Sequence, residues 1–168
     1  TQKREIIRER HIIDSAQAIE FIDLNCDFVY DLGSGAGFPG IVLAIFNVNY
    51  DFHVKLYEKS AVKSAFLKKI VKELDLNAKI LGNIYDDNID SDYIVCRAFK
   101  KLDRIIQVSR EIVKKPHKLI VLKVQNAHKD LKKAFKREKY DYILKDSIKN
   151  KSSKIVIVDI KKWQQLFQ

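Results

Sequence analysis

The chain has 168 residues, 46% of them apolar, which is enough for one domain with a sizeable core. No run reaches the roughly 18 uninterrupted apolar residues that a membrane span needs, and the charged start leads into no secretory apolar segment. We therefore expect a soluble, cytoplasmic protein. Cys26 and Cys96 are too few for a disulfide framework or a zinc site, so we expect buried thiols and no metal.

Basic residues are concentrated in one segment. The net charge is +10, yet residues 97–139 hold 15 Lys and Arg against 4 Asp and Glu, while the rest of the chain holds 17 against 18. This polarised charge indicates a polyanionic partner, nucleic acid before a membrane surface. The alternative is a lysine-rich chain whose basic residues only keep its surface solvated.

The predicted elements alternate after a first helix. Apolar residues at three- and four-residue steps predict an amphipathic helix over 3–24. The following strands are predicted over 28–32, 52–58, 78–81, 93–96 and 119–123. The intervening and following helices are predicted over 39–46, 61–74, 102–113 and 128–136. Such alternation predicts a parallel sheet that is covered on both faces.

The tail breaks this alternation. Two β-rich runs, 140–148 and 155–160, flank the polar stretch "KNKSS", which predicts a pair of antiparallel strands. No internal repeat or linker divides the chain. We expect a single domain over 1–168, with an N-terminal helical segment over 1–24 and the sheet core over 28–168.

The stretch "DLGSGAGFPG" predicts a ligand site at the first strand-to-helix turn, which supplies the floor of the site in open α/β sheets. Three glycines, Gly33, Gly35 and Gly37, follow Asp31 at a closer spacing than the dinucleotide fingerprint G-x-G-x-x-G. That spacing and the preceding acid suit a ligand that carries an ammonium and a sulfonium. Glu58 ends the next predicted strand, where a carboxylate can accept both hydroxyls of a ribose. We expect a nucleoside-containing cofactor here, and the alternative is a tight turn without a ligand.

The motif "DLGSGAGFPGI" resembles the first motif of class I S-adenosylmethionine methyltransferases. Together with "RHIIDSAQ", "CRAFKKL" and "LIVLK", in that order along the chain, it resembles the glucose-inhibited division protein B family. The resemblance implies a Rossmann-like, mostly parallel seven-stranded sheet with helices on both faces and an antiparallel C-terminal strand. It also implies S-adenosyl-L-methionine as cofactor and methylation of N7 of a guanine, guanine 527 in the family, in 16S ribosomal RNA of the small ribosomal subunit.

The resemblance also implies which residues bind the cofactor. Gly33 and Phe38 would line its pocket, residues 83–85 would lie on its adenine side, and Arg97 would contact it. From the residues alone, a phosphate or Asp31 are other partners for Arg97. Where the family has a carboxylate, this chain has Tyr85, and Asp86 is a candidate substitute. The predicted cofactor-binding residues are Asp31, Gly33, Gly35, Gly37, Phe38, Glu58, Asn83, Ile84, Tyr85 and Arg97.

The expected acceptor needs no general base, because N7 of guanine is a lone-pair acceptor with no proton to remove. The candidates for positioning the reactants are Arg97, Lys123 and His11, although a helix His is more often structural. The predicted RNA-binding residues are Arg10, Lys123, Lys129, Lys132, Lys133, Lys136 and Arg137.

We expect a monomer that binds 16S ribosomal RNA or the small ribosomal subunit. Two alternatives stay open. One is a methyltransferase that acts on a substrate other than RNA. The other is a catalytically inactive RNA-binding module on the same fold, suggested by Tyr85 and by Val124, where the family typically has glycine.

Overall fold

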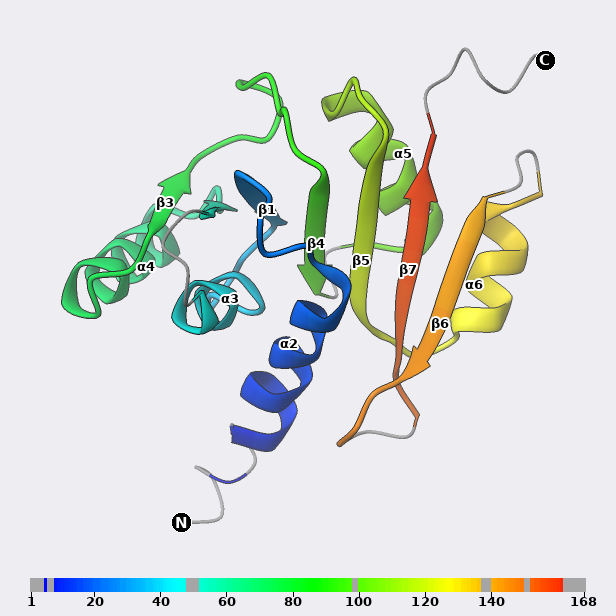
Figure 1. Cartoon of the computed structure of the whole chain (residues 1–168), viewed down its shortest axis with the longest axis horizontal. Helices are drawn as coiled ribbons and strands as arrows, with labels where there is room; N and C mark the ends of the chain where they lie inside the picture. The colour runs from blue at the N-terminus through cyan, green and yellow to red at the C-terminus, as the bar shows by residue number, and fades with distance from the viewer. Residues whose placement is uncertain are drawn as a thin grey trace.

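The computed structural model describes residues 5, 8–47, 52–97, 100–136, 140–149 and 152–161. These residues form a seven-stranded sheet in the order β3-β2-β1-β4-β5-β7-β6, with β3 and β6 at its two edges (Figure 1). The strands are β1 (Phe28–Leu32), β2 (His53–Tyr57), β3 (Ala78–Leu81), β4 (Tyr93–Arg97), β5 (His117–Val124), β6 (Asp141–Asp146) and β7 (Lys154–Ile160). The pairings among β1 to β5 are parallel, whereas β7 is antiparallel to both β5 and β6. The predicted mostly parallel sheet with an antiparallel C-terminal strand is confirmed.

Four helices follow strands of the sheet, close to their predicted positions. They are α3 (Gly40–Phe46), α4 (Ala61–Glu73), α5 (Leu102–Ile112) and α6 (Ala127–Ala134). The hydroxyl of Ser60 caps α4 by accepting a hydrogen bond from the backbone N–H of Lys63 at 3.4 Å. Pro39 precedes the first residue of α3 instead of opening the helix, so the predicted start of this helix was one residue early.

The N-terminal helix differs from its prediction. The described residues form three successive pieces, namely the π-helix η1 (Arg8–Ile13), the short α2 (Asp14–Ala16) and the 3₁₀ helix η2 (Gln17–Phe21). The predicted helix is thus helical over the described residues 8–21, but it is not one regular α-helix and it ends at Phe21 instead of residue 24. The hydroxyl of Ser15 donates to the carbonyl of His11, and such back-bonding competes with regular helix hydrogen bonds.

Contacts with the distant β6–β7 turn hold this segment in place. The carboxylate of Asp14 accepts a hydrogen bond of 2.7 Å from the hydroxyl of Ser147. The backbone N–H of Ile148 donates to the side-chain oxygen of Gln17 at 3.0 Å. The geometry of the segment thus depends on tertiary partners as well as on its own sequence.

Helices cover both faces of the sheet, as predicted. One core contains Leu43 of α3 and Leu67 of α4, packed with Val29 on the sheet. The other core joins α5 and α6 to the opposite face, where Tyr30 points. Neighbouring residues of β1 therefore enter different cores, which explains why all but the first residue of this strand is buried.

Candidate active site

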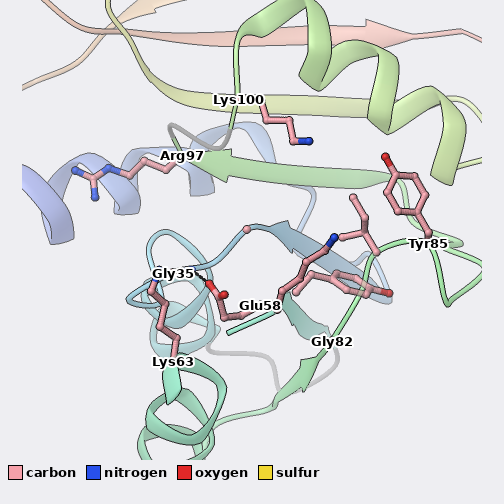
Figure 2. Close-up of a pocket in the computed structure, with 11 residues that line it drawn as sticks. Gly35, Glu58, Lys63, Gly82, Tyr85, Arg97 and Lys100 are labelled. Atoms are coloured by element: carbon pink, nitrogen blue, oxygen red, sulfur yellow. Dashed lines mark hydrogen bonds between the residues drawn. The ribbon is translucent and has the colours of Figure 1, made fainter. Parts of the chain in front are cut away.

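A cavity of about 410 Å³ opens at the carboxyl ends of β1 to β4. Strand order reverses here, because β1 lies between β2 and β4, and open α/β sheets bind ligands at such a point. Figure 2 shows how the loops after these strands surround the cavity. The volume suits a small-molecule ligand. The described residues that line it are Gly33, Gly35, Tyr57, Glu58, Lys59, Lys63, Gly82, Ile84, Tyr85, Arg97 and Lys100.

The glycine turn and Glu58 form one wall of the cavity. The backbone N–H of Gly35 donates to Oε2 of Glu58 at 2.9 Å, the bond drawn in Figure 2, and the N–H of Ser60 donates to Oε1 at 2.8 Å. A carboxylate has about four acceptor positions, so each oxygen keeps one for a ligand. Gly35 adopts φ +57°, a conformation that favours glycine and leaves the backbone bare toward the cavity. This wall can therefore receive a group with two hydroxyls.

Gly37 has a packing role. Its φ is +97°, and a Cβ placed there would lie 2.6 Å from Cγ1 of Ile41 and 3.0 Å from Cδ2 of Leu67. The absence of a side chain lets the turn lie against α3 and α4. Gly37 is not among the described lining residues of the cavity, so the structure separates it from Gly33 and Gly35.

Asp31 also lies behind the cavity wall. Its side chain is fully buried, and Oδ2 accepts a hydrogen bond of 3.0 Å from the backbone N–H of Gly40. Oδ1 has no hydrogen-bond partner among the described residues. Burial raises the pKa of Asp31 to about 7, against the opposing effect of its hydrogen bonds. Asp31 thus supports the end of the glycine turn through its bond to Gly40 and does not line the cavity.

The loop after β3 forms the wall on the predicted adenine side. Ile84 and Tyr85 line the cavity, and their contact with a cofactor stays a prediction. The amide of Asn83 instead donates to Oδ1 of Asp86 at 2.9 Å, so these two side chains pair within the loop. Neither Asn83 nor Asp86 is among the described lining residues.

Tyr57 connects this loop to the sheet. Its hydroxyl donates to Oδ2 of Asp87 at 2.9 Å, while its buried ring lies 6.1 Å from the ring of Tyr30. Burial, followed by the neighbouring Asp87, raises the pKa of Tyr57. The bond holds the loop beside the cavity.

Arg97 at the end of β4 lines the cavity on the side of the N-terminal segment. Its guanidinium carbon lies 5.9 Å from the ring centre of Phe38, and the ring of His11 stacks on Phe38 at 5.2 Å. Partial burial lowers the pKa of Arg97, and Asp14 opposes this effect. Figure 2 shows the side chain extending away from Glu58. Phe38 and His11 are not among the described lining residues of the cavity. The acid whose charge raises the pKa of Arg97 is Asp14, and not Asp31 as the sequence allowed.

The predicted RNA-binding lysines of α6 and of the turn that follows it lie on an exposed surface. Lys129, Lys132, Lys133 and Lys136 are all exposed, and Lys133 forms an ion pair of 2.8 Å with Asp103. Such an exposed pair contributes little to stability. The side chains of Arg10 and Lys123, and the whole of Arg137, lie outside the described residues.

The sequence did not predict five residues that line the cavity, namely Tyr57, Lys59, Lys63, Gly82 and Lys100. The signal that could have found them is their position in the chain, because they lie at or shortly after the ends of β2, β3 and β4. Among the described residues, no group of three or more His, Cys, Asp or Glu is placed to hold a metal ion. No described helix combines the length and apolar character needed to cross a membrane.

The chain is similar to known proteins over nearly its whole length. The family model "rRNA small subunit methyltransferase G" matches residues 1–158. The ribosomal RNA small subunit methyltransferase G of Pelagibacter ubique is 41% identical over 166 residues, which cover 96% of this chain and 77% of the relative. The protein of the same name from Rickettsia typhi is 36% identical, with 90% and 78% covered.

Solved structures show the same fold. An S-adenosylmethionine-dependent methyltransferase from Aquifex aeolicus superposes with a TM-score of 0.63 at 13% identity, covering 92% of each chain. At this identity the likeness concerns the fold alone. The predicted class I methyltransferase fold is confirmed.

Proposed function

We propose that this chain methylates N7 of a guanine in 16S ribosomal RNA, because it belongs to the family of rRNA small subunit methyltransferase G. Membership makes the chain a methyltransferase that uses S-adenosyl-L-methionine and acts on small-subunit ribosomal RNA. The acceptor atom and the nucleotide, guanine 527 in the resemblance, belong to the proposal. The observation that carries it is the convergence of the glycine turn, Glu58 and Arg97 on one cavity.

The residues present fit the cofactor. Both oxygens of Glu58 keep an acceptor position, so this carboxylate would hold the two ribose hydroxyls. Ile84 and Tyr85 offer apolar surface beside the cavity for the adenine. Arg97 would hold the carboxylate of the methionine moiety, as a cation at the opposite end from Glu58. When bound, the cofactor supplies an electrophilic methyl group on its sulfonium.

The lining residues suit an acceptor that needs no base. N7 of guanine presents a lone pair and loses no proton on methylation. Glu58, the acid among the described lining residues, is already engaged by two backbone N–H groups. The protein's main task is then to hold N7 in line with the methyl group, and such positioning can contribute about 7 to 11 kcal/mol.

The position of Arg97 is compatible with the positive charge that develops on the acceptor base during methyl transfer. Methyl transfer moves positive charge onto the purine, so a cation close to the ring would oppose the reaction. Arg97 lies beside Phe38 and is influenced by Asp14, on the far side of the cavity from Glu58. We assign it, with His11 and Lys123, a positioning role rather than contact with N7.

The RNA substrate must present an accessible guanine. The N7 edge lies in the deep, narrow groove of A-form RNA, so the acceptor belongs in a loop or is flipped out of its stack. We assign phosphate contacts to the exposed Lys129 and Lys132 of α6, to Lys136 just after this helix, and to Arg10, Lys123 and Arg137. Lys133 is a weaker candidate because Asp103 pairs with it.

The proposal is tested by methyl transfer from labelled S-adenosylmethionine to small ribosomal subunits that lack the modification, and in parallel to naked 16S ribosomal RNA. Mass spectrometry of the digested RNA identifies the product nucleoside. We expect N7-methylguanosine at a single position. A different methylated nucleoside would refute the acceptor, and binding of cofactor and RNA without any transfer would favour the inactive RNA-binding module.

A further inference from the structure

We propose that three lysines at the cavity, Lys59, Lys63 and Lys100, form a lysine rim that receives backbone phosphates of the RNA. We propose further that these phosphates relieve a charge conflict between the rim and the methyl donor. RNA and S-adenosylmethionine would then each strengthen the binding of the other. The inference rests on the proposed function, because it takes RNA as the acceptor.

The rim consists of exposed side chains from two sides of the cavity. Lys59 directly follows Glu58, and Lys63 lies in the first turn of α4, whereas Lys100 precedes α5. Figure 2 shows Lys63 and Lys100 on either side of Glu58. A strand of phosphates laid along these ammonium groups would pass directly over the cofactor cavity.

The cavity carries an excess of positive charge. Its described lining includes four cations, the rim lysines and Arg97, but one carboxylate, that of Glu58. Lys59 and Lys63 form no ion pair with any acid among the described residues. Glu58 already accepts two backbone hydrogen bonds, which withdraw part of its negative charge from the cavity. Lys59 and Lys63 therefore place positive charge at the mouth of the cavity that no described acid pairs with.

This positive charge conflicts with the methyl donor. S-adenosylmethionine carries a sulfonium, an ammonium and a carboxylate, so its net charge is +1 at neutral pH. The product S-adenosylhomocysteine lacks the sulfonium and has no net charge. The rim should thus oppose the donor more than the product. Each RNA phosphate brings one negative charge, so bound RNA removes the conflict, and by linkage the donor strengthens RNA binding by the same factor.

The test compares a rim variant with a control variant that loses the same charge near the cavity but outside its lining. The rim variant is Lys59→Gln with Lys63→Gln. The control is Lys68→Gln with Lys72→Gln, because these exposed lysines belong to α4, as Lys63 does, but do not line the cavity. Both variants lose the same total charge. Calorimetry at low salt gives the affinities for S-adenosylmethionine and S-adenosylhomocysteine without RNA, and a salt titration gives the affinity for an unmodified 16S ribosomal RNA transcript.

Without RNA, we expect the rim variant, but not the control, to bind S-adenosylmethionine about two- to fourfold more tightly than the wild type. Its affinity for S-adenosylhomocysteine should change little. We also expect it to bind RNA more weakly, with the slope of log K against log salt reduced by about one to two. Equal weakening of both nucleosides would show that the lysines hold the cofactor and would overturn the inference. An unchanged affinity ratio or an unchanged salt slope would overturn it as well.

These readouts are separate from the test of the proposed function. They measure binding and need no methyl transfer. Loss of the expected N7-methylguanosine with the affinity changes in place would refute the proposed acceptor and leave the rim intact. N7-methylguanosine with wild-type affinities in the rim variant would refute the rim alone.

Discussion

The backbone N–H of Gly35 donates a hydrogen bond of 2.9 Å to Oε2 of Glu58, which joins the glycine turn after β1 to the acid that follows β2. Parallel pairing of the two strands, with Leu32 opposite Tyr57, places these loops side by side. The bond fixes the direction of the carboxylate before any ligand arrives. The proposed binding of the cofactor at this wall would therefore need little rearrangement, which favours affinity.

The hydrogen bond between Tyr57 and Asp87 should support cofactor affinity without contact between Asp87 and the cofactor. Tyr57→Phe removes the bond that holds the loop after β3, so we expect affinity for S-adenosylmethionine to fall about three- to tenfold, with a decrease of about 1 kcal/mol in unfolding free energy. Asp87→Asn keeps an acceptor and should retain affinity. Tyr142→Phe, an exposed tyrosine on β6, is the control. Wild-type affinity in Tyr57→Phe would show that the loop needs no such support.

Gly37 should be critical for stability. Gly37→Ala forces a side chain into φ +97° and brings its Cβ within 2.6 Å of Ile41, so we expect the unfolding free energy to fall by roughly 2 to 4 kcal/mol. Gly82→Ala is the control, because a Cβ there has nothing within 4 Å. Urea denaturation measures both. If the two variants are destabilised equally, the packing argument fails.

Asp31 should make the stability of the ligand-free protein depend on pH. The buried carboxyl has a pKa of about 7, above the ordinary value of 3.8, so the folded state stays protonated where the unfolded state ionises. Its stabilising contribution is complete below about pH 4 and is lost as pH rises to about 7, by up to about 1.4 kcal/mol per pH unit. The unfolding free energy of the wild type, minus that of Asp31→Asn, should thus decrease as the pH rises from about 5 to about 7. A constant difference across this range would contradict the burial effect.

The exposed lysines of α6, together with Lys136 just after it, should contribute to RNA affinity through charge. Replacing Lys129, Lys132 and Lys136 with Gln should weaken binding of 16S ribosomal RNA and reduce its salt slope by roughly one for each phosphate that is no longer neutralised. Lys79→Gln, an exposed lysine on β3, serves as control. An unchanged salt slope in the triple variant would remove α6 from the RNA-binding surface.

The sheet could be predicted from sequence because buried parallel strands form continuous apolar runs. "YIVC" and "LIVL" became the centres of β4 and β5, with their ends shifted by a few residues. The N-terminal segment could not be predicted in the same way. Its shape depends on contacts such as that between Gln17 and Ile148, which are 131 residues apart in the chain.

The candidate site was predicted in part for a similar reason. Local spacing identified Gly33, Gly35 and Glu58, since the ends of adjacent parallel strands must meet. The direction of a side chain depends on packing that spacing does not encode. Phe38 lies against His11, and Asn83 turns to Asp86, so neither lines the cavity. The starts of α4 and α5 were predicted, but the rim lysines follow no spacing motif that would have singled them out.

The central claim is that the cavity beside Glu58 binds the methyl donor, and calorimetric titration of S-adenosylmethionine tests it most directly. We expect Glu58→Gln, which keeps one acceptor oxygen but loses the charge, to weaken binding about ten- to a hundredfold, because hydrogen bonds to charged groups contribute about 1.5 to 3 kcal/mol. Glu73→Gln, an exposed acid at the end of α4, should bind like wild type. Equal affinity for the wild type and Glu58→Gln would contradict the account.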